Sequence, residues 1–271
     1  MRRHSSRAWA LLALFAFAAC AHASERRVLR VCADPADLPF SNRAKSGFEN
    51  AIVDVVAKSL GADIEYVWWS QWRGFARKTL GADACDLWPG VATGVESMTV
   101  TRPYYRSTYV FVTRADRNLD VRSFDDARLR TLTIGVQLIG NDGTNTPPAH
   151  ALARRGIVSN VRGYVVYDVR ANSSPIVTAV ADETLDVAIV WGPTAGYFAK
   201  TSSVPLRLQP TPATDGSLPM TFAIGMGIRR NDNELRAEID RALLEEQADI
   251  VKILARYSVP QVAESSGLSA E

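Results

Sequence analysis

Short apolar stretches alternate with amphipathic stretches along most of the chain, and this alternation predicts the secondary structure. Residues that favour β-structure, flanked by turn residues, predict strands at 28–33, 64–69, 87–91, 109–113, 131–138, 164–169, 187–191 and 221–228. Apolar positions at helical spacing predict helices at 49–60, 72–79, 150–155, 176–181 and 233–257. Strands that alternate with helices at this spacing are typical of mainly parallel sheets with helical crossovers. The pattern therefore predicts an α/β fold.

Two interruptions in the pattern predict that one lobe is inserted into the other. The polar stretch 114–126 is a candidate hinge, and the Pro- and Thr-rich stretch 204–218 is a candidate return crossing. We expect lobe one to comprise residues 24–113 plus 212–271, and lobe two to comprise 114–211. This topology places a cleft between the lobes, at the carboxyl ends of the strands, where open α/β sheets bind ligands.

The first 23 residues read as a signal peptide, which predicts a periplasmic location. Three arginines precede an apolar run at 8–19, which is far shorter than the ~20 residues that span a bilayer. Ala21-His22-Ala23 is a small-x-small cleavage motif, so we expect cleavage before Ser24. An N-terminal core helix fits this order poorly. A lipoprotein acylated on Cys20 is the other alternative, with Phe17 where a Leu-like residue is needed.

Cleavage changes the chemistry that the sequence suggests. Loss of Arg2, Arg3 and Arg7 takes the formal net charge from +2 to −1. No basic stripe then remains to bind nucleic acid, and no second apolar run predicts a membrane span. Two cysteines remain, Cys32 and Cys85, and an even pair in an oxidising compartment predicts a disulfide.

Several motifs carry a resemblance to known proteins. The order of elements, with Leu29-Arg30-Val31…Pro39-Phe40, Asp86-Leu87-Trp88, Pro103-Tyr104-Tyr105 and Leu185–Ile189, resembles the solute-binding proteins of polar-amino-acid ABC transporters. A narrower set resembles the MxaJ/XoxJ-type accessory proteins: Cys32–Pro35, Leu38–Asn42, Gly47–Asn50, Trp69, Arg73–Phe75, Thr79-Leu80, Cys85-Asp86 and Thr101–Ser107. The resemblance implies a type II periplasmic binding-protein fold. It also implies association with a periplasmic PQQ-dependent methanol dehydrogenase, in its maturation or activity, with the cytochrome c of that enzyme as a second candidate partner.

The resemblance also locates the ligand cleft, which departs from the family pattern. Amino-acid binders hold the ligand carboxylate with an arginine after the third strand, but 93–98 contains none. Trp191 stands where the family has its ammonium-binding aspartate, and Asp142 would repel a carboxylate. The cleft instead looks aromatic, and tryptophan, tyrosine and arginine are the residues that anchor protein interfaces. The candidate cleft residues are Phe40, Trp69, Trp72, Arg73, Thr93, Tyr104, Tyr105, Asp142 and Trp191.

Catalytic chemistry has little support in the sequence. His150 is the only histidine after cleavage, and its place at a helix start favours a cap or an exposed role. No nucleophile–base set, metal-ligand spacing or complete nucleotide motif is present, so we predict a non-catalytic protein without a cofactor. The favoured function is an accessory protein that holds a protein partner. The alternative is a transport binding protein for an uncharged or aromatic small molecule.

Overall fold

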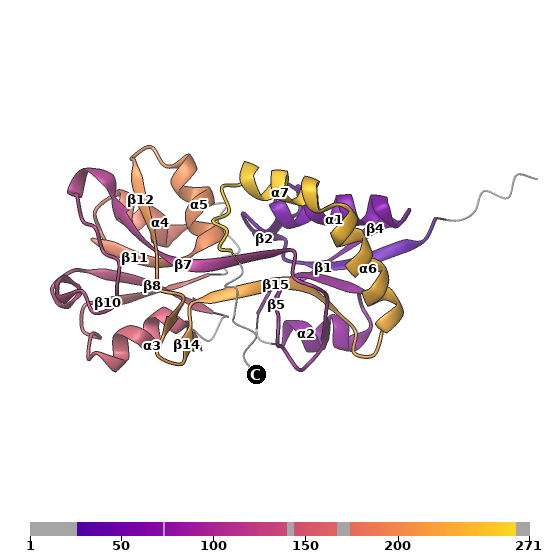
Figure 1. Ribbon diagram of the computed structural model, residues 1–271, viewed down its shortest axis with the longest axis horizontal. Coiled ribbons are helices and arrows are strands. Elements are labelled where there is room, and N and C mark those ends of the chain that lie inside the picture. The colour runs from indigo at the N-terminus through magenta and orange to yellow at the C-terminus, as the bar shows by residue number, and fades with distance from the viewer. Residues whose placement is uncertain (1–25, 73, 140–143, 167–173, 264–271) are drawn as a thin grey trace, which may run out of the picture.

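The computed structural model describes residues 26–72, 74–139, 144–166 and 174–263, which form two lobes (Figure 1). One mixed sheet runs through both lobes in the order β10-β8-β11-β7-β15-β5-β1-β4. Each half of the sheet has its own core and its own helices. The predicted α/β class and two-lobed architecture are confirmed, whereas the predicted signal peptide lies outside the described residues.

Lobe one is built on four strands. Its sheet contains β1 (Val28–Ala33), β4 (Asp63–Trp68), β5 (Leu87–Ala92) and β15 (Thr221–Ile228). The first three are parallel, and β15 is antiparallel to β5. The main core lies between this sheet and α1 (Phe48–Ser59), α6 (Asn233–Glu245) and α7 (Gln247–Arg256). The short helix α2 (Phe75–Lys78) covers the opposite face (Figure 1).

Lobe two repeats this plan with a core on each face of its sheet. The sheet contains β7 (Tyr105–Arg114), β8 (Ile134–Ile139), β10 (Val161–Val165), β11 (Val187–Trp191) and β12 (Leu206–Pro210). Strands β8, β10 and β11 are parallel, while β7 is antiparallel to β11 and β12. Helix α3 (Pro147–Arg154) packs on one face, and α4 (Pro175–Ala181) and α5 (Gly192–Thr201) pack on the other.

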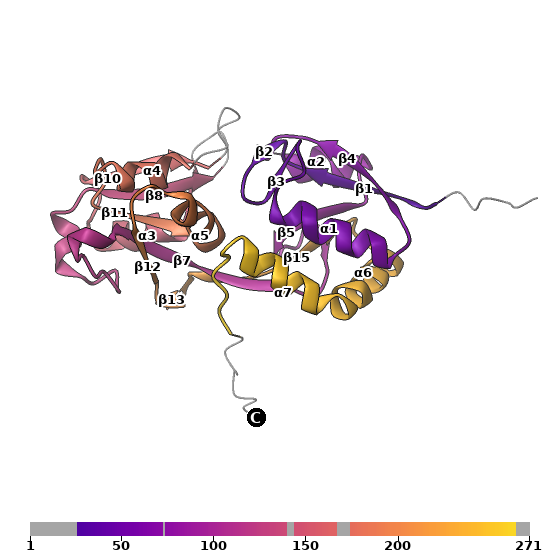
Figure 2. The ribbon, with the colours of Figure 1, turned by 90° about the horizontal axis from the view of Figure 1, so that it is seen from above.

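Short elements complete the fold. They are β2 (Ala36–Asp37), β3 (Ser41–Asn42), β6 (Thr99–Val100), β9 (Thr144–Asn145), β13 (Thr214–Asp215), β14 (Leu218–Pro219) and the 3-10 turns η1 (Leu80–Ala82), η2 (Ala115–Arg117) and η3 (Ala127–Arg130). The β2–β3 pair forms a loop beside the gap between the lobes, as Figure 2 shows.

The lobes are joined by long strands and by the C-terminal segment. Strand β7 pairs with β15 through Tyr105–Thr108 and with β11 through Tyr109–Val112, so the crossing falls inside this strand. The sequence placed the lobe boundary at 113/114, and that exact boundary stays a prediction. After α7 the chain passes along α5, where Ser107 donates a hydrogen bond of 2.6 Å to the Pro260 carbonyl. A Cβ at Gly196 would lie 1.9 Å from the Ser258 carbonyl oxygen, so only glycine allows this approach.

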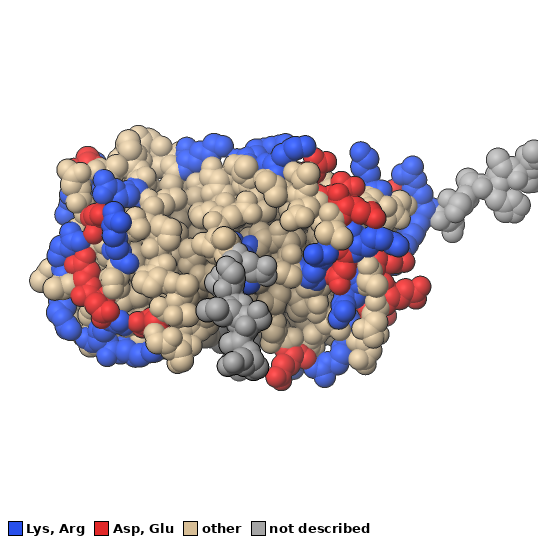
Figure 3. Space-filling model, viewed as in Figure 1, with Lys and Arg blue, Asp and Glu red and all other residues tan. Residues whose placement is uncertain are grey.

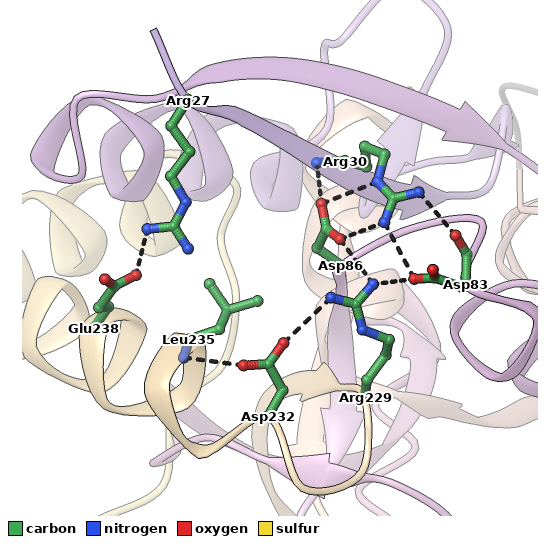
Figure 4. Close-up of polar contacts among 8 residues, drawn as sticks. All are labelled: Arg27, Arg30, Asp83, Asp86, Arg229, Asp232, Leu235 and Glu238. Carbon is green, nitrogen blue, oxygen red and sulfur yellow. Dashed lines mark hydrogen bonds and ion pairs between the residues drawn. The ribbon is translucent and has the colours of Figure 1, made fainter.

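An ionic network closes the outer end of lobe one (Figure 4). Asp86 accepts hydrogen bonds from the Arg30 side chain at 2.7 and 3.2 Å and from Arg229 at 3.0 Å. Arg229 also pairs with Asp232, which caps α6 by accepting from the Leu235 N–H at 3.2 Å. The network therefore ties the amino ends of β1 and β5 to the start of α6, away from the carboxyl ends that face lobe two.

The structure contains the predicted disulfide. Cys32 and Cys85 are bonded, with Cα atoms 5.7 Å apart, which confirms the pairing.

The prediction of a single helix over 233–257 is wrong, because the chain divides at Glu246 into two helices, α6 and α7. A straight helix over that range would be about 37 Å long. The break lets both halves bury apolar residues in the same core, including Leu243 and Leu254.

Candidate functional site

A cavity of about 430 Å³ lies between the lobes and is lined by residues from both. Strand ends and loops of lobe one supply Phe40, Gly90 and Tyr105, whereas lobe two supplies Tyr109 and Trp191. The cavity is therefore at the place expected for the ligand cleft of a parallel α/β sheet. In Figure 3 charged side chains are most frequent at the two ends and along the upper edge of the face shown.

Three rings form a cluster at the lobe-two side of the cavity. The centroids of Tyr109 and Trp191 are 5.3 Å apart, those of Trp191 and Phe222 are 5.9 Å apart, and the planes meet nearly edge to face. Such pairs contribute about 0.5–1.5 kcal/mol beyond the area that they bury. Trp191 lies directly opposite Tyr109 in the β7–β11 pairing, and the backbone N–H of Trp191 donates a hydrogen bond of 2.6 Å to Gln137 Oε1. The ring cluster is thus fixed by the strand register.

A buried carboxyl, Glu49, lies at the lobe-one side of the cavity. Glu49 is in the first turn of α1 and packs against Gly90, where a Cβ would lie 2.4 Å from Glu49 Oε1 and where the φ of +81° favours glycine. The Tyr104 hydroxyl donates to Glu49 at 3.4 Å and accepts from the Gly90 N–H at 3.0 Å. Burial raises the pKa of Glu49 to about 8, while the Tyr104 hydrogen bond opposes that rise.

Two further carboxyls come from the loop that follows β1. Asp34 accepts hydrogen bonds from the backbone N–H groups of Ala36 at 2.8 Å and Gln71 at 2.7 Å. Asp37 lines the cavity and is 9% exposed, and no described residue donates a hydrogen bond to its carboxyl. Burial, followed by repulsion from Asp34 and Glu49, raises the pKa of Asp37 well above its ordinary value. The cavity therefore combines aromatic rings with buried acids.

A wider groove of about 920 Å³ continues from the cavity along lobe one. The two spaces share the lining residues Gln71, Gly90, Ala92 and Ile139. Apolar side chains line much of the groove, among them Trp72, Phe75, Trp88 and Met98. The cavity and the groove therefore adjoin each other along lobe one.

The nine residues proposed from the sequence lie in several places. Phe40, Tyr105 and Trp191 line the cavity, and Tyr104 reaches it through Glu49 and Gly90. Trp72 lines the groove instead.

Two of the other proposed residues, Trp69 and Thr93, do not line the cavity. Trp69 is 44% exposed beneath Lys78, whose Nζ lies 5.8 Å from the ring centroid. Thr93 is exposed, and its backbone N–H pairs with Ala223. Arg73 and Asp142 lie outside the described residues.

The lining residues that were not proposed from the sequence include two acids and two aromatic residues: Asp37, Glu49, Tyr109 and Phe222. Glu49 sat inside a quoted motif, and an acid followed by an apolar helical pattern reads as an ordinary first helical turn. Asp37 reads as a turn residue beside Pro39. Only the folded chain shows that both acids are buried and face the same space.

The comparisons with known proteins agree with this geometry. Residues 29–259 match the bacterial extracellular solute-binding proteins, family 3, so the chain belongs to that family. It is 33% identical over 248 residues to Protein MoxJ of Methylorubrum extorquens (strain ATCC 14718 / DSM 1338 / JCM 2805 / NCIMB 9133 / AM1), which covers 86% of this chain and 81% of that protein.

Two solved structures define the type within the family. The periplasmic binding protein XoxJ from Methylobacterium extorquens AM1 has a TM-score of 0.73 and 36% identity, over 87% of this chain and 100% of that one. MxaJ from Methlophaga aminisulfidivorans MPT has a TM-score of 0.72 and 25% identity, over 86% of this chain and 100% of that one. The chain is thus of the MxaJ/XoxJ type, which confirms the resemblance found in its motifs.

The family and these relatives imply a periplasmic location. Within the described residues, no helix is long and apolar enough to cross a membrane. The same residues contain no group of three or more His, Cys, Asp or Glu side chains suited to hold a metal ion.

Proposed function

We propose that this protein is a non-catalytic accessory protein of a periplasmic PQQ-dependent methanol dehydrogenase. It acts in the maturation or activation of that enzyme and holds a segment of it in the interlobe cleft. The cytochrome c of the same system is a second candidate partner. The likeness to MoxJ, XoxJ and MxaJ supports the association with methanol oxidation.

The residues that line the cavity are the main support for the role of the cleft. Five aromatic side chains line the cavity, and no Lys, Arg or His does so among the residues described: Phe40, Tyr105, Tyr109, Trp191 and Phe222. An amino-acid ligand would leave its carboxylate without a cationic partner, at a cost of several kcal/mol. Buried rings can instead anchor a protein segment, because ring burial is the dominant energy of many interface hot spots.

The groove supports a protein segment as the occupant. It extends the cavity along lobe one and carries Trp72 and Trp88. A solute would fill only the cavity of about 430 Å³. That volume lies within the range of about 300–1,000 Å³ typical of small-molecule sites. A transport binding protein for a small molecule is therefore the second candidate function.

Surface plasmon resonance against apo and holo dehydrogenase tests the proposal. We compare wild type with Trp191→Ala, which opens the ring cluster, and with Trp69→Ala as the matched control outside both spaces. We expect Trp191→Ala to weaken binding at least about tenfold, as for a central aromatic anchor, and Trp69→Ala to leave it unchanged. Equal binding by all three proteins would place the contact elsewhere.

A further inference from the structure

The groove beside α2 carries large apolar side chains that remain exposed. Trp72, Val95 and Ile139 line it and are 45%, 38% and 44% exposed. Trp72 comes just before α2, Val95 lies between β5 and β6, and Ile139 ends β8, so both lobes contribute (Figure 1). Single exposed apolar residues are common on protein surfaces, whereas several gathered at one groove mark an interaction site.

Arginines line the same groove. Arg77, Arg229 and Arg230 are among its lining residues, and none of the lining residues described is Asp or Glu. Arg229 is engaged in the ionic network, where it pairs with Asp86 and Asp232 (Figure 4). The adjoining cavity has the reverse composition, with two carboxyl groups and no Lys, Arg or His among the lining residues described. The groove therefore offers cations where the cavity offers none.

Two of these arginines can pair with a partner. Arg77, on α2, and Arg230, after β15, are both exposed. Within the described parts of the chain neither forms an ion pair with an acid, and Arg230 donates instead to the backbone carbonyl of Glu96. The planar guanidinium group matches the geometry of a carboxylate. Arginine and aromatic residues are enriched in protein interfaces, so their combination here favours a protein ligand that carries acids.

We propose that the groove binds a protein segment that combines acidic side chains with aromatic or aliphatic ones. Its carboxylates pair with Arg77 and Arg230, and its apolar side chains cover Trp72, Val95 and Ile139. A purely apolar segment would bury the guanidinium groups without partners, and a basic segment would be repelled. The inference rests on the proposed function, in which the segment belongs to the dehydrogenase. It is tested without that enzyme, so either proposal can fail while the other stands.

Selection from a phage-displayed library of random dodecapeptides tests the inference on the chain without its predicted signal peptide. We expect the enriched peptides to carry net negative charge together with aromatic or aliphatic residues. Fluorescence polarisation then measures the affinity of the best peptides for wild type and for Arg77→Gln/Arg230→Gln. The variant should bind them about tenfold or more weakly, because two charge-assisted contacts are lost. Replacing Asp and Glu of a peptide by Asn and Gln should weaken its binding to wild type by a similar factor.

A matched variant separates the groove from the net charge of the protein. Arg162→Gln/Arg241→Gln removes two exposed arginines that line neither the cavity nor the groove, and it should bind the peptides like wild type. No enrichment, enriched peptides without net negative charge, or undiminished binding by Arg77→Gln/Arg230→Gln would overturn the inference. Self-association of wild type that Arg77→Gln/Arg230→Gln abolishes would place a second copy in the groove and overturn it too. Peptides that behave as expected would support it even if the dehydrogenase does not bind, and only the proposed function would then fail.

Discussion

Glu49 should make the protein less stable as the pH rises, and Glu49→Gln should remove that effect. Burial raises the pKa of Glu49 to about 8 from an ordinary 4.5. Between these values the folded chain keeps a proton that the unfolded chain has lost. Stability therefore falls with increasing pH across this window, because the folded state binds more protons.

The size of the effect follows from the same two values. Each pKa unit corresponds to about 1.4 kcal/mol, so the three pH units from 5 to 8 give an upper limit of about 4 kcal/mol. Water that enters the cavity lowers this figure, and we expect wild type to lose about 2–4 kcal/mol relative to Glu49→Gln. Glutamine keeps an oxygen that can accept from Tyr104, so the variant changes the charge with little change in shape.

Urea unfolding at pH 5, 6, 7 and 8 measures the difference between the two proteins. Taking the difference removes the contributions of groups that both proteins share. Glu65→Gln is the control, and its curve should run parallel to that of wild type because Glu65 is exposed. If the Glu49→Gln curve also runs parallel to wild type, Glu49 is ionised in the folded protein and the argument for a buried neutral carboxyl is refuted.

Three further predictions concern the scaffold and the ligand. Asp86→Asn should cost about 1–3 kcal/mol in urea unfolding, because Arg30 and Arg229 lose a shared acceptor. Burial would raise the pKa of Asp86, but hydrogen bonds and charges from Arg30 and Arg229 lower this pKa overall. The stabilisation by Asp86 should therefore be present above about pH 4 and lost below it. An Asp86→Asn variant as stable as wild type at pH 7 would contradict this prediction. Thiol titration of denatured, unreduced protein should find no free thiol at Cys32 or Cys85, and Cys32→Ser should cost about 2–4 kcal/mol; two free thiols would contradict the bond. Calorimetry against free amino acids should show no micromolar binding, and micromolar affinity for any of them would show that the cleft retains the amino-acid clamp.

Local patterns were sufficient to predict much of the fold. Strand β1 was predicted over the residues that form it, since its apolar run is bounded by polar residues and a Pro-containing turn. Among the longer elements, one helix and one strand were missed. Helix α5 begins Gly192-Pro193 directly after β11, where glycine and proline favour a turn. Strand β12 lies in a Pro-rich stretch and ends at Pro210, and it forms because Val110 and Val112 of β7 offer an antiparallel edge.

The site was less accessible to sequence reasoning than the fold. Trp191 could be placed in the cleft because it ends a strand, at the position where the family has its ammonium-binding aspartate. Trp69 is also a tryptophan directly after a strand, yet it lines neither the cavity nor the groove and is 44% exposed. The buried acids Asp37 and Glu49 come from a turn and a helix start. Their proximity depends on tertiary packing that local patterns do not encode.

Hydrogen–deuterium exchange of this protein, with and without apo methanol dehydrogenase, tests the central claim most directly. The account predicts slower exchange in the segments that line the cleft, above all 37–49, 105–109 and 191–194, with little change in α4 and the outer end of lobe one. Unchanged exchange throughout the cleft in a complex shown to form would contradict the account, and protection confined to the outer face of either lobe would do the same.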